Sequence, residues 1–217
     1  LLVSSFVNPH DITLWGQLTL AADLSGSQGA FYLAQQLVGS NVPHNLFDPL
    51  YEQSAREDLS AKPTAQGSFV QRYPDGFQPL RNDTDYHRFY YQLQKNVDEQ
   101  IGKVINALTG DRKQYRDTII IYLSDHGEML GEHGELTHGL LPFAGARRVP
   151  LLLAGPGVPA GRTSNCLTAT ADVAPTLLAL AGVTPPDGLD GRALVSGRLP
   201  GAAAAAAAAA ETAGDAE

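Results

Sequence analysis

The chain has 217 residues, and 43% of them are hydrophobic, which is enough for one sizeable core. Its formal net charge of -8 argues against a nucleic-acid partner, because binding to phosphate backbones needs clustered Lys and Arg, and none cluster here. Cys166 is the only cysteine, so the sequence excludes an intrachain disulfide and a zinc site built on several thiolates. We expect Cys166 to pack as a small apolar residue.

The first predicted element is an apolar run at residues 1–7, which favours a buried strand. The run does not begin with Met, and we expect it to come from the middle of a longer protein, so the compartment stays open. No apolar run in the sequence approaches the length of a membrane span, and no signal-peptide pattern is present. Asn8 and Pro9 form a turn that lets His10 project from the end of the strand, where side chains often line a site in α/β sheets.

The segment from residue 11 to residue 83 has an irregular pattern, with one short periodic stretch at residues 31–37. Long loops of this kind are more often functional than idle, and we expect this one to run over the rim of the sheet and shape a pocket. Trp15, Tyr73 and Phe77 are available to stack on a ring, although loop aromatics pack against the protein more often than against ligands.

Apolar residues at spacings of three and four predict a helix: Phe89, Leu93, Val97, Ile101, Val104, Ile105 and Leu108. Asp83 or Thr84 would cap its start, and Gly110 its end. The Ile-rich run at residues 119–123 then predicts a strand buried on both faces. A helix followed by a buried strand is typical of an α/β fold with a parallel sheet covered by helices.

A second buried strand is predicted at residues 149–154, and a short helix at residues 174–180 with Asp172 near its cap and Gly182 after it. After residue 195 the pattern changes to Gly and Pro and then to nine alanines. An alanine run without an amphipathic face has nothing to dock, so it favours a frayed or disordered tail. The sequence therefore predicts one domain at residues 1–195 and a tail at residues 196–217.

Asp125, His126 and Gly127 directly follow the Ile-rich strand. A carboxylate and an imidazole side by side are suitable ligands for a divalent metal, and Gly127 would let the backbone turn tightly beneath a bound ion. A second His-Gly pair begins at His138, and the glycines between the pairs would let it fold back to contact an anion or the metal. Taken alone, Asp125 fits a helix N-cap about as well as a metal ligand, and His10 is more often solvent-facing.

Between the two His-Gly pairs lie Glu128, Glu132 and His133. Carboxylates in such loops more often satisfy loop or solvent contacts than perform acid-base work, and a single loop histidine is usually solvent-facing or capping. We therefore expect structural roles for these three residues.

Residues 117–134 resemble the signature of the sulfatase family in the alkaline-phosphatase superfamily, and residues 148–157 resemble the strand that follows it. Three more segments resemble the family in order and spacing: residues 8–11, 97–102 and 172–183. Together these segments cover most of residues 1–191, and such an ordered set is more specific than any single motif. The resemblance implies an alkaline-phosphatase-like, mostly parallel sheet covered by helices, present here in part.

The resemblance also implies site residues. Asp125 and His126 correspond to divalent-metal ligands, and His10 to a residue that contacts the sulfate group or its leaving oxygen. His138 stands where relatives carry a Lys or a His-Gly pair, so it would contact the sulfate or protonate the leaving group. The metal is calcium in most sulfatases, but an imidazole ligand also suits manganese or zinc. The implied substrate is a small-molecule sulfate ester.

Two family features do not occur in this sequence. The family's nucleophile is a formylglycine made from a Cys/Ser-x-Pro-x-Arg motif beside a pair of Asp residues, and Cys166 is not followed by Pro and Arg in that pattern. The family's smaller C-terminal domain is also missing from the sequence. We therefore expect a fragment of a sulfuric ester hydrolase that is inactive when isolated. Two alternatives stay open: a phosphonate monoester or phosphodiester hydrolase or phosphoethanolamine transferase of the same superfamily, and a catalytically inactive truncated remnant.

Overall fold

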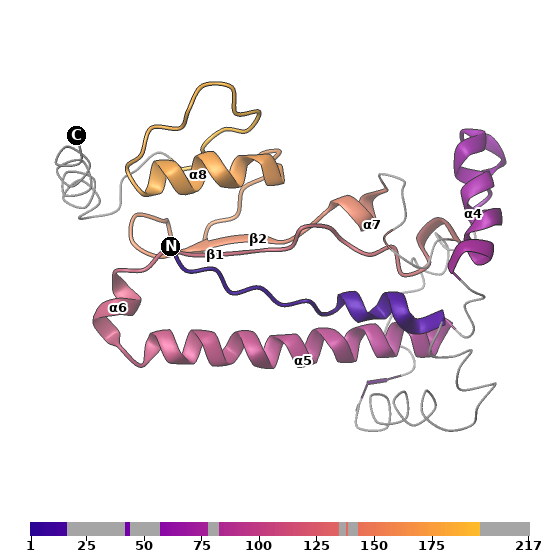
Figure 1. Cartoon of the computed structure of the whole chain (residues 1–217), viewed down its shortest axis with the longest axis horizontal. Helices are drawn as coiled ribbons and strands as arrows, with labels where there is room; N and C mark the ends of the chain where they lie inside the picture. Colours follow the sequence, from indigo (N-terminus) through magenta and orange to yellow (C-terminus); the bar gives the residue numbers. More distant parts are fainter. Residues whose placement is uncertain (17–41, 44–56, 78–82, 135–137, 139–142, 196–217) are drawn as a thin grey trace, which may run out of the picture. The chain divides into compact units, whose positions relative to one another are not determined.

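The computed structural model describes residues 1–16, 42–43, 57–77, 83–134, 138 and 143–195 (Figure 1). The chain divides into two compact units. The first unit comprises Leu1–Ile105 and His126–Val149, and the second comprises Asn106–Asp125 and Pro150–Glu217. The described elements, in chain order, are η1 (His10–Leu14), η2 (Leu59–Ala61), α4 (Thr64–Phe77), α5 (Asp83–Thr109), α6 (Arg112–Arg116), β1 (Ile120–Leu123), η3 (Glu132–Gly134), α7 (Ala144–Arg147), β2 (Leu151–Ala154), η4 (Thr170–Asp172) and α8 (Val173–Leu180).

The long helix predicted from the apolar spacing is confirmed as α5, which begins at Asp83 and ends before Gly110. Its first turns pack against η1 in the core of the first unit, and Figure 1 shows η1 beside this end of the helix. The cluster contains Ile12, Trp15, Tyr86, Phe89 and Leu93. The ring centroids of Trp15 and Phe89 lie 5.6 Å apart. Because Trp15 is only 2% exposed, it serves this core and is not available to stack on a ligand.

The two predicted strands are present as β1 and β2, which pair with Ile120 opposite Ala154 and Leu123 opposite Leu151. The pair is antiparallel, so the parallel arrangement expected from the helix-then-strand order does not hold for these two strands. A parallel pair needs a crossover connection, usually an α-helix. In its described part, the connection from β1 to β2 contains only η3 and the four-residue α7.

Two expectations about strands are wrong. Residues 1–7 form no strand and are exposed, with Leu1 102% and Leu2 87% exposed, because no described strand offers them hydrogen-bond partners. β1 is not buried on both faces, since Tyr122 is 43% and Leu123 39% exposed. The sheet consists of two strands in the part of the chain that the structure describes, so little covers its faces.

The segment from residue 11 to residue 83 is less irregular than expected, because it contains η1, η2 and the 14-residue helix α4. α4 carries Gly67, Pro74 and Gly76, residue types that oppose helix formation, which explains why the sequence did not predict it. The periodic stretch at residues 31–37 lies outside the described residues. So does the tail at residues 196–217.

In the second unit, the short helix predicted near residue 174 is confirmed as α8. Gly182 follows it with a φ of 76°, a left-handed conformation typical of helix ends. The expectation that Cys166 packs inside the protein is wrong, because this free cysteine is exposed. Among the described residues, no helix has the length and apolar character needed to cross a bilayer.

Candidate functional site

The loop after β1 begins with Asp125, His126 and Gly127 and packs closely against α7. The Gly127 amide donates to the carbonyl of Ala146 at 2.6 Å. A Cβ atom on Gly127 would lie 2.0 Å from the carbonyl oxygen of Gly145. Gly127 does not have a positive φ, so it is required for close approach to α7 and not for the tight turn that the sequence suggested.

The orientation of the His126 ring favours metal binding. Its Nδ1 lies 2.9 Å from the carbonyl oxygen of Gly127. When the Nδ1–H donates to this carbonyl, Nε2 carries the lone pair, which is the tautomer typical of a metal-ligating histidine. Asp125 precedes His126 at the end of β1, is exposed, and accepts a hydrogen bond from Ser124 Oγ at 3.5 Å.

Three predicted histidines meet in the first unit. The ring centroids of His126 and His138 lie 4.5 Å apart, and those of His10 and His138 lie 6.4 Å apart. His10 is the exposed first residue of η1 and does not end a strand as the sequence suggested. The structure therefore brings His10, His126 and His138 together in the first unit.

Glu128 belongs to the same group of side chains, which the sequence interpretation missed. Its side chain is only 6% exposed, and its Oε2 lies 3.5 Å from His138 Nδ1. Burial raises the pKa of Glu128 to about 8, although hydrogen bonds from the Met129 amide and from Tyr86 lower it in part. Of the loop or solvent contacts expected for Glu128, the structure shows loop contacts, with the Met129 amide and with His138. The sequence places Glu128 next to the Asp-His-Gly motif, but no local pattern signals its burial.

The first turns of α5 hold this loop in place. Tyr86 hydrogen-bonds to the Glu128 carboxyl, and His87 Nε2 lies 2.5 Å from the carbonyl oxygen of Leu130. Leu130 has a φ of 55°, a conformation uncommon for residues other than glycine, so this contact supports a strained position. Burial and the nearby Glu128 charge raise the pKa of Tyr90 to about 12. The core helix thus fixes the backbone that presents Glu128.

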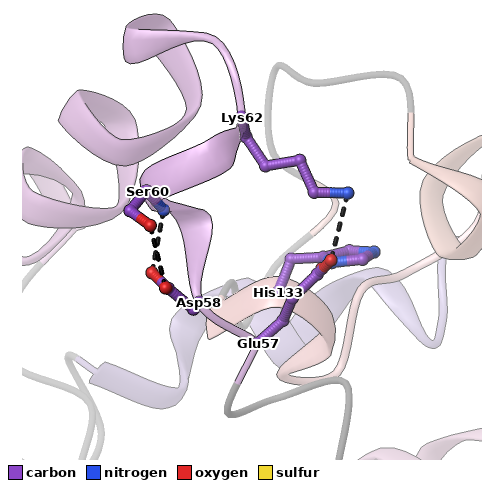
Figure 2. A network of polar contacts seen from close by, with 5 residues as sticks. All are labelled: Glu57, Asp58, Ser60, Lys62 and His133. Atoms are coloured by element: carbon purple, nitrogen blue, oxygen red, sulfur yellow. Dashed lines mark hydrogen bonds and ion pairs between the residues drawn. The ribbon is translucent and has the colours of Figure 1, made fainter.

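A second cluster surrounds His133, as Figure 2 shows. His133 Nδ1 contacts the Glu57 carboxylate, and Lys62 Nζ lies 3.0 Å from Glu57 Oε1. The hydrogen bond from Lys62, and then that from His133, hold the pKa of Glu57 below its ordinary value. The His133 ring also stacks on Phe143, with centroids 3.9 Å apart and planes at 20°. His133 is therefore partly buried in contacts rather than solvent-facing.

Within the described ranges, no group of three or more His, Cys, Asp or Glu side chains is arranged to enclose a metal ion. Asp125 and His126 provide one hard oxygen and one imidazole nitrogen, a donor pair that suits a divalent cation. These residues fit a part of a metal site, not a complete ligand shell.

Comparison with known proteins supports a single family. The Sulfatase family model matches residues 17–183. The uncharacterized sulfatase YidJ of Escherichia coli is 34% identical over 149 residues, which are 68% of this chain and 29% of that protein. Choline-sulfatase of Rhizobium meliloti is 43% identical over 97 residues, which are 45% of this chain and 18% of that protein. Human arylsulfatase K is 36% identical over 107 residues, which are 49% of this chain and 20% of that protein.

This chain therefore spans less than a third of the length of these relatives. Two solved structures share its fold. A candidate sulfatase from Bacteroides thetaiotaomicron has a TM-score of 0.61 at 23% identity, and the 2-O GAG sulfatase BT1596 has a TM-score of 0.57 at 22% identity. Each match covers 86% of this chain and 38% of the other chain, which confirms the α/β, alkaline-phosphatase-like class. The family model and the relatives agree, and the chain belongs to the sulfatase family.

Proposed function

We propose that this chain contributes part of the divalent-metal and sulfate-binding site of a sulfuric ester hydrolase that acts on a small-molecule sulfate ester. The observation that carries the proposal is the meeting of His10, His126 and His138, and Asp125 directly precedes His126 in the sequence. Membership of the sulfatase family supports the reaction class, and the matched relatives do not favour the phosphoryl-transfer alternatives.

Asp125 and His126 would hold the cation that sulfatases generally use. We propose calcium because a carboxylate oxygen is its usual ligand, while the imidazole of His126 also suits manganese or zinc. When bound, such a cation supplies positive charge that polarises the ester oxygens. The chain's own contribution is to fix the ligand orientation, since the bond to the Gly127 carbonyl keeps His126 in one tautomer.

His10 and His138 would act on the sulfate ester itself. Imidazole N–H groups donate hydrogen bonds to sulfate oxygens and stabilise charge that builds up on them. When the bond between sulfur and the leaving oxygen breaks, that oxygen takes a proton from one of the two rings and leaves as a hydroxyl group. We propose a formylglycine as the nucleophile, and since its motif is not in this sequence, turnover would require the enzyme that carries both parts.

Cation binding tests the metal part of the proposal. We expect isothermal titration of the 217-residue chain with calcium, and separately with manganese, to give saturable binding. Asp125→Asn and His126→Ala should weaken it by at least about tenfold, the usual scale for losing a metal contact. At an ionic strength of about 0.15 M, which screens distant charges, Asp98→Asn at an exposed position of α5 should leave it unaltered. Equal binding by all three variants would contradict the assignment.

Turnover tests the catalytic part. The probes are 4-nitrophenyl sulfate and choline sulfate, assayed with the enzyme that carries these residues together with a nucleophile motif. We expect His10→Ala and His138→Ala to lower kcat by about 10²- to 10⁴-fold, the usual worth of a general acid. Faster hydrolysis of a phosphonate monoester than of either sulfate ester would instead assign the chain to phosphoryl chemistry.

A further inference from the structure

The segment that carries His138 is tied together at its two ends. His138 lies midway in the sequence between His133 and Phe143. The rings of His133 and Phe143 stack with centroids 3.9 Å apart. When the ends of a loop are held in contact, the residues between them can reach fewer positions. The stack therefore limits where His138 can lie.

His133 is itself anchored to a distant part of the chain. Its Nδ1 contacts the carboxylate of Glu57, 76 positions earlier in the sequence. Lys62 holds the other oxygen of that carboxylate at 3.0 Å, as Figure 2 shows. Because Glu57 has two cationic or proton-donating partners, its carboxylate stays ionised and its pKa is lowered.

The backbone of His133 has an uncommon conformation. It has a φ of 56° and a ψ of 24°, the left-handed region that residues other than glycine rarely adopt. The next residue, Gly134, would adopt this conformation more readily, yet the structure places it at His133. The stack on Phe143 and the bond to Glu57 are the described contacts that offset its cost.

His138 itself lies in the candidate site. Its ring lies 4.5 Å from that of His126, and its Nδ1 lies 3.5 Å from Glu128 Oε2. We propose that Glu57, His133 and Phe143 form a clamp that positions His138 in the site. The clamp residues are positioning residues, since they act through His138. The proposal rests on the proposed function in that His138 acts on the sulfate ester.

Kinetics provide the first test, in the enzyme that carries these residues together with a nucleophile motif. We expect Phe143→Ala and His133→Ala to lower kcat for 4-nitrophenyl sulfate by about tenfold to a hundredfold, because a displacement of about 1 Å can cost that much. KM and calcium affinity should change less than about twofold. His133→Phe keeps the stacked ring and should recover most of the loss, and Glu57→Gln should give a smaller loss.

Tyr115→Ala is the matched control, because it removes an exposed aromatic ring from the second unit. It should leave kcat unaltered. If His133→Ala does not fold, Phe143→Leu and Glu57→Gln still test the clamp. An unaltered kcat in folded Phe143→Ala, or a loss that follows calcium affinity, would overturn the proposal.

Histidine NMR gives a second readout that does not depend on turnover. The chain has six histidines, and the ring signals of ¹³C-labelled protein can be assigned to His138 by their loss in His138→Gln. We expect Phe143→Ala to shift or broaden the His138 signal while the His87 signal stays in place. If the signal moves but the wild-type enzyme hydrolyses no sulfate ester, the clamp stands and the proposed function fails. An unmoved His138 signal would overturn the clamp whatever the activity.

Discussion

At the scale of single residues, Gly127 and Gly145 let two stretches of backbone approach each other more closely than other residues would permit. A Cβ on Gly145 would lie 3.2 Å from the carbonyl oxygen of Glu128, and a Cβ on Gly127 would lie 2.0 Å from the carbonyl oxygen of Gly145. Real Cβ atoms do not come this close to backbone atoms. The contact holds the loop at Gly127 against α7, so it fixes the backbone next to His126.

Gly127→Ala should therefore destabilise the chain by about 1–3 kcal/mol, the usual cost of overpacking a filled site. Gly102→Ala is the matched control, because Gly102 lies within α5 and a Cβ there meets nothing within 4 Å. That change should stabilise the chain by about 0.5–1 kcal/mol, since alanine is the better helix former. Urea unfolding of the two variants should give free-energy changes of opposite sign. A neutral Gly127→Ala would show that α7 can move away.

Glu128 is a second residue whose surroundings decide its chemistry. Its pKa is about 8 in the folded chain, compared with an ordinary value of 4.5, because burial disfavours the charged form. Between these two values the folded chain binds a proton that the unfolded chain does not bind. Raising the pH through this range therefore favours unfolding.

From this difference we expect the metal-free chain to lose stability as the pH rises from about 5 to about 8, by at most about 1.4 kcal/mol per pH unit. Glu128→Gln has no proton to lose and keeps a hydrogen-bonding side chain, so its stability should depend less steeply on pH. Urea unfolding at several pH values in the presence of a chelator measures both slopes. Glu132→Gln serves as the control. Parallel pH profiles for Glu128→Gln and the wild type would contradict the buried, neutral carboxyl.

At the scale of elements, Asp172 joins three parts of the second unit. Its carboxylate accepts hydrogen bonds from the amides of Ala169 at 2.9 Å and Arg192 at 2.8 Å. Its backbone carbonyl accepts from Thr176 Oγ1, and that hydroxyl accepts in turn from the Leu194 amide at 3.0 Å. As the sequence predicted, Asp172 is the N-cap residue of α8, but its carboxylate bonds to the start of η4 and to the segment after α8 rather than to the helix amides.

Asp172→Ala should make the segment after α8 more mobile, and amide hydrogen exchange can measure this change. We expect faster exchange at Arg192 and Leu194, with little change in β1 and β2. The hydrogen bonds from Arg192 and Ala169 lower the pKa of Asp172, so its contribution is present above pH 4 and is lost as the pH falls through the lowered pKa. Asp187→Ala, at an exposed turn, should leave exchange at both amides as in the wild type. The same result for Asp172→Ala would exclude this role.

The elements also show which features a single sequence can predict. α5 and the two strands were predicted from the spacing of apolar residues, because this spacing can be read directly from the sequence. α4 was missed because Gly67 and Pro74 oppose the helix that the chain nevertheless forms. Residues 1–7 have the composition of a strand, but they form none, because a strand also needs a neighbouring strand to pair with and the described residues offer none.

The candidate site also has some features that the sequence predicts and others that it does not. His126 and His138 were identified by their glycine-rich motifs, and their proximity to each other and to His10 agrees with the predicted folding of the second pair onto the first. The burial of Glu128 and the contact between Glu57 and His133 depend on residues that are distant in sequence. No local pattern contains such information, so these features required the structure.

At the scale of the whole molecule, the chain carries a net charge of -8 and yet belongs to a family whose substrates are anions. A negative field attracts cations and repels anions over distances comparable to the Debye length. The global charge therefore opposes the approach of a sulfate ester and assists the binding of a metal cation. In the proposed function, the attraction for the ester therefore comes from local groups such as His10 and His138.

The affinity of the chain for calcium should therefore depend on the ionic strength. The Debye length falls from about 30 Å at an ionic strength of about 0.01 M to about 8 Å at about 0.15 M, so distant carboxylates stop contributing at the higher salt. We expect the calcium Kd of the chain to rise several-fold across this range, as isothermal titration can measure. Glu99→Lys on the exposed face of α5 makes the chain less negative and should weaken binding at low salt more than at high salt. Asp125→Asn should weaken binding at both, because it removes a contact that salt does not screen. If Glu99→Lys and Asp125→Asn show the same salt dependence, the field of the whole molecule does not assist the cation, and its affinity comes from local ligands alone.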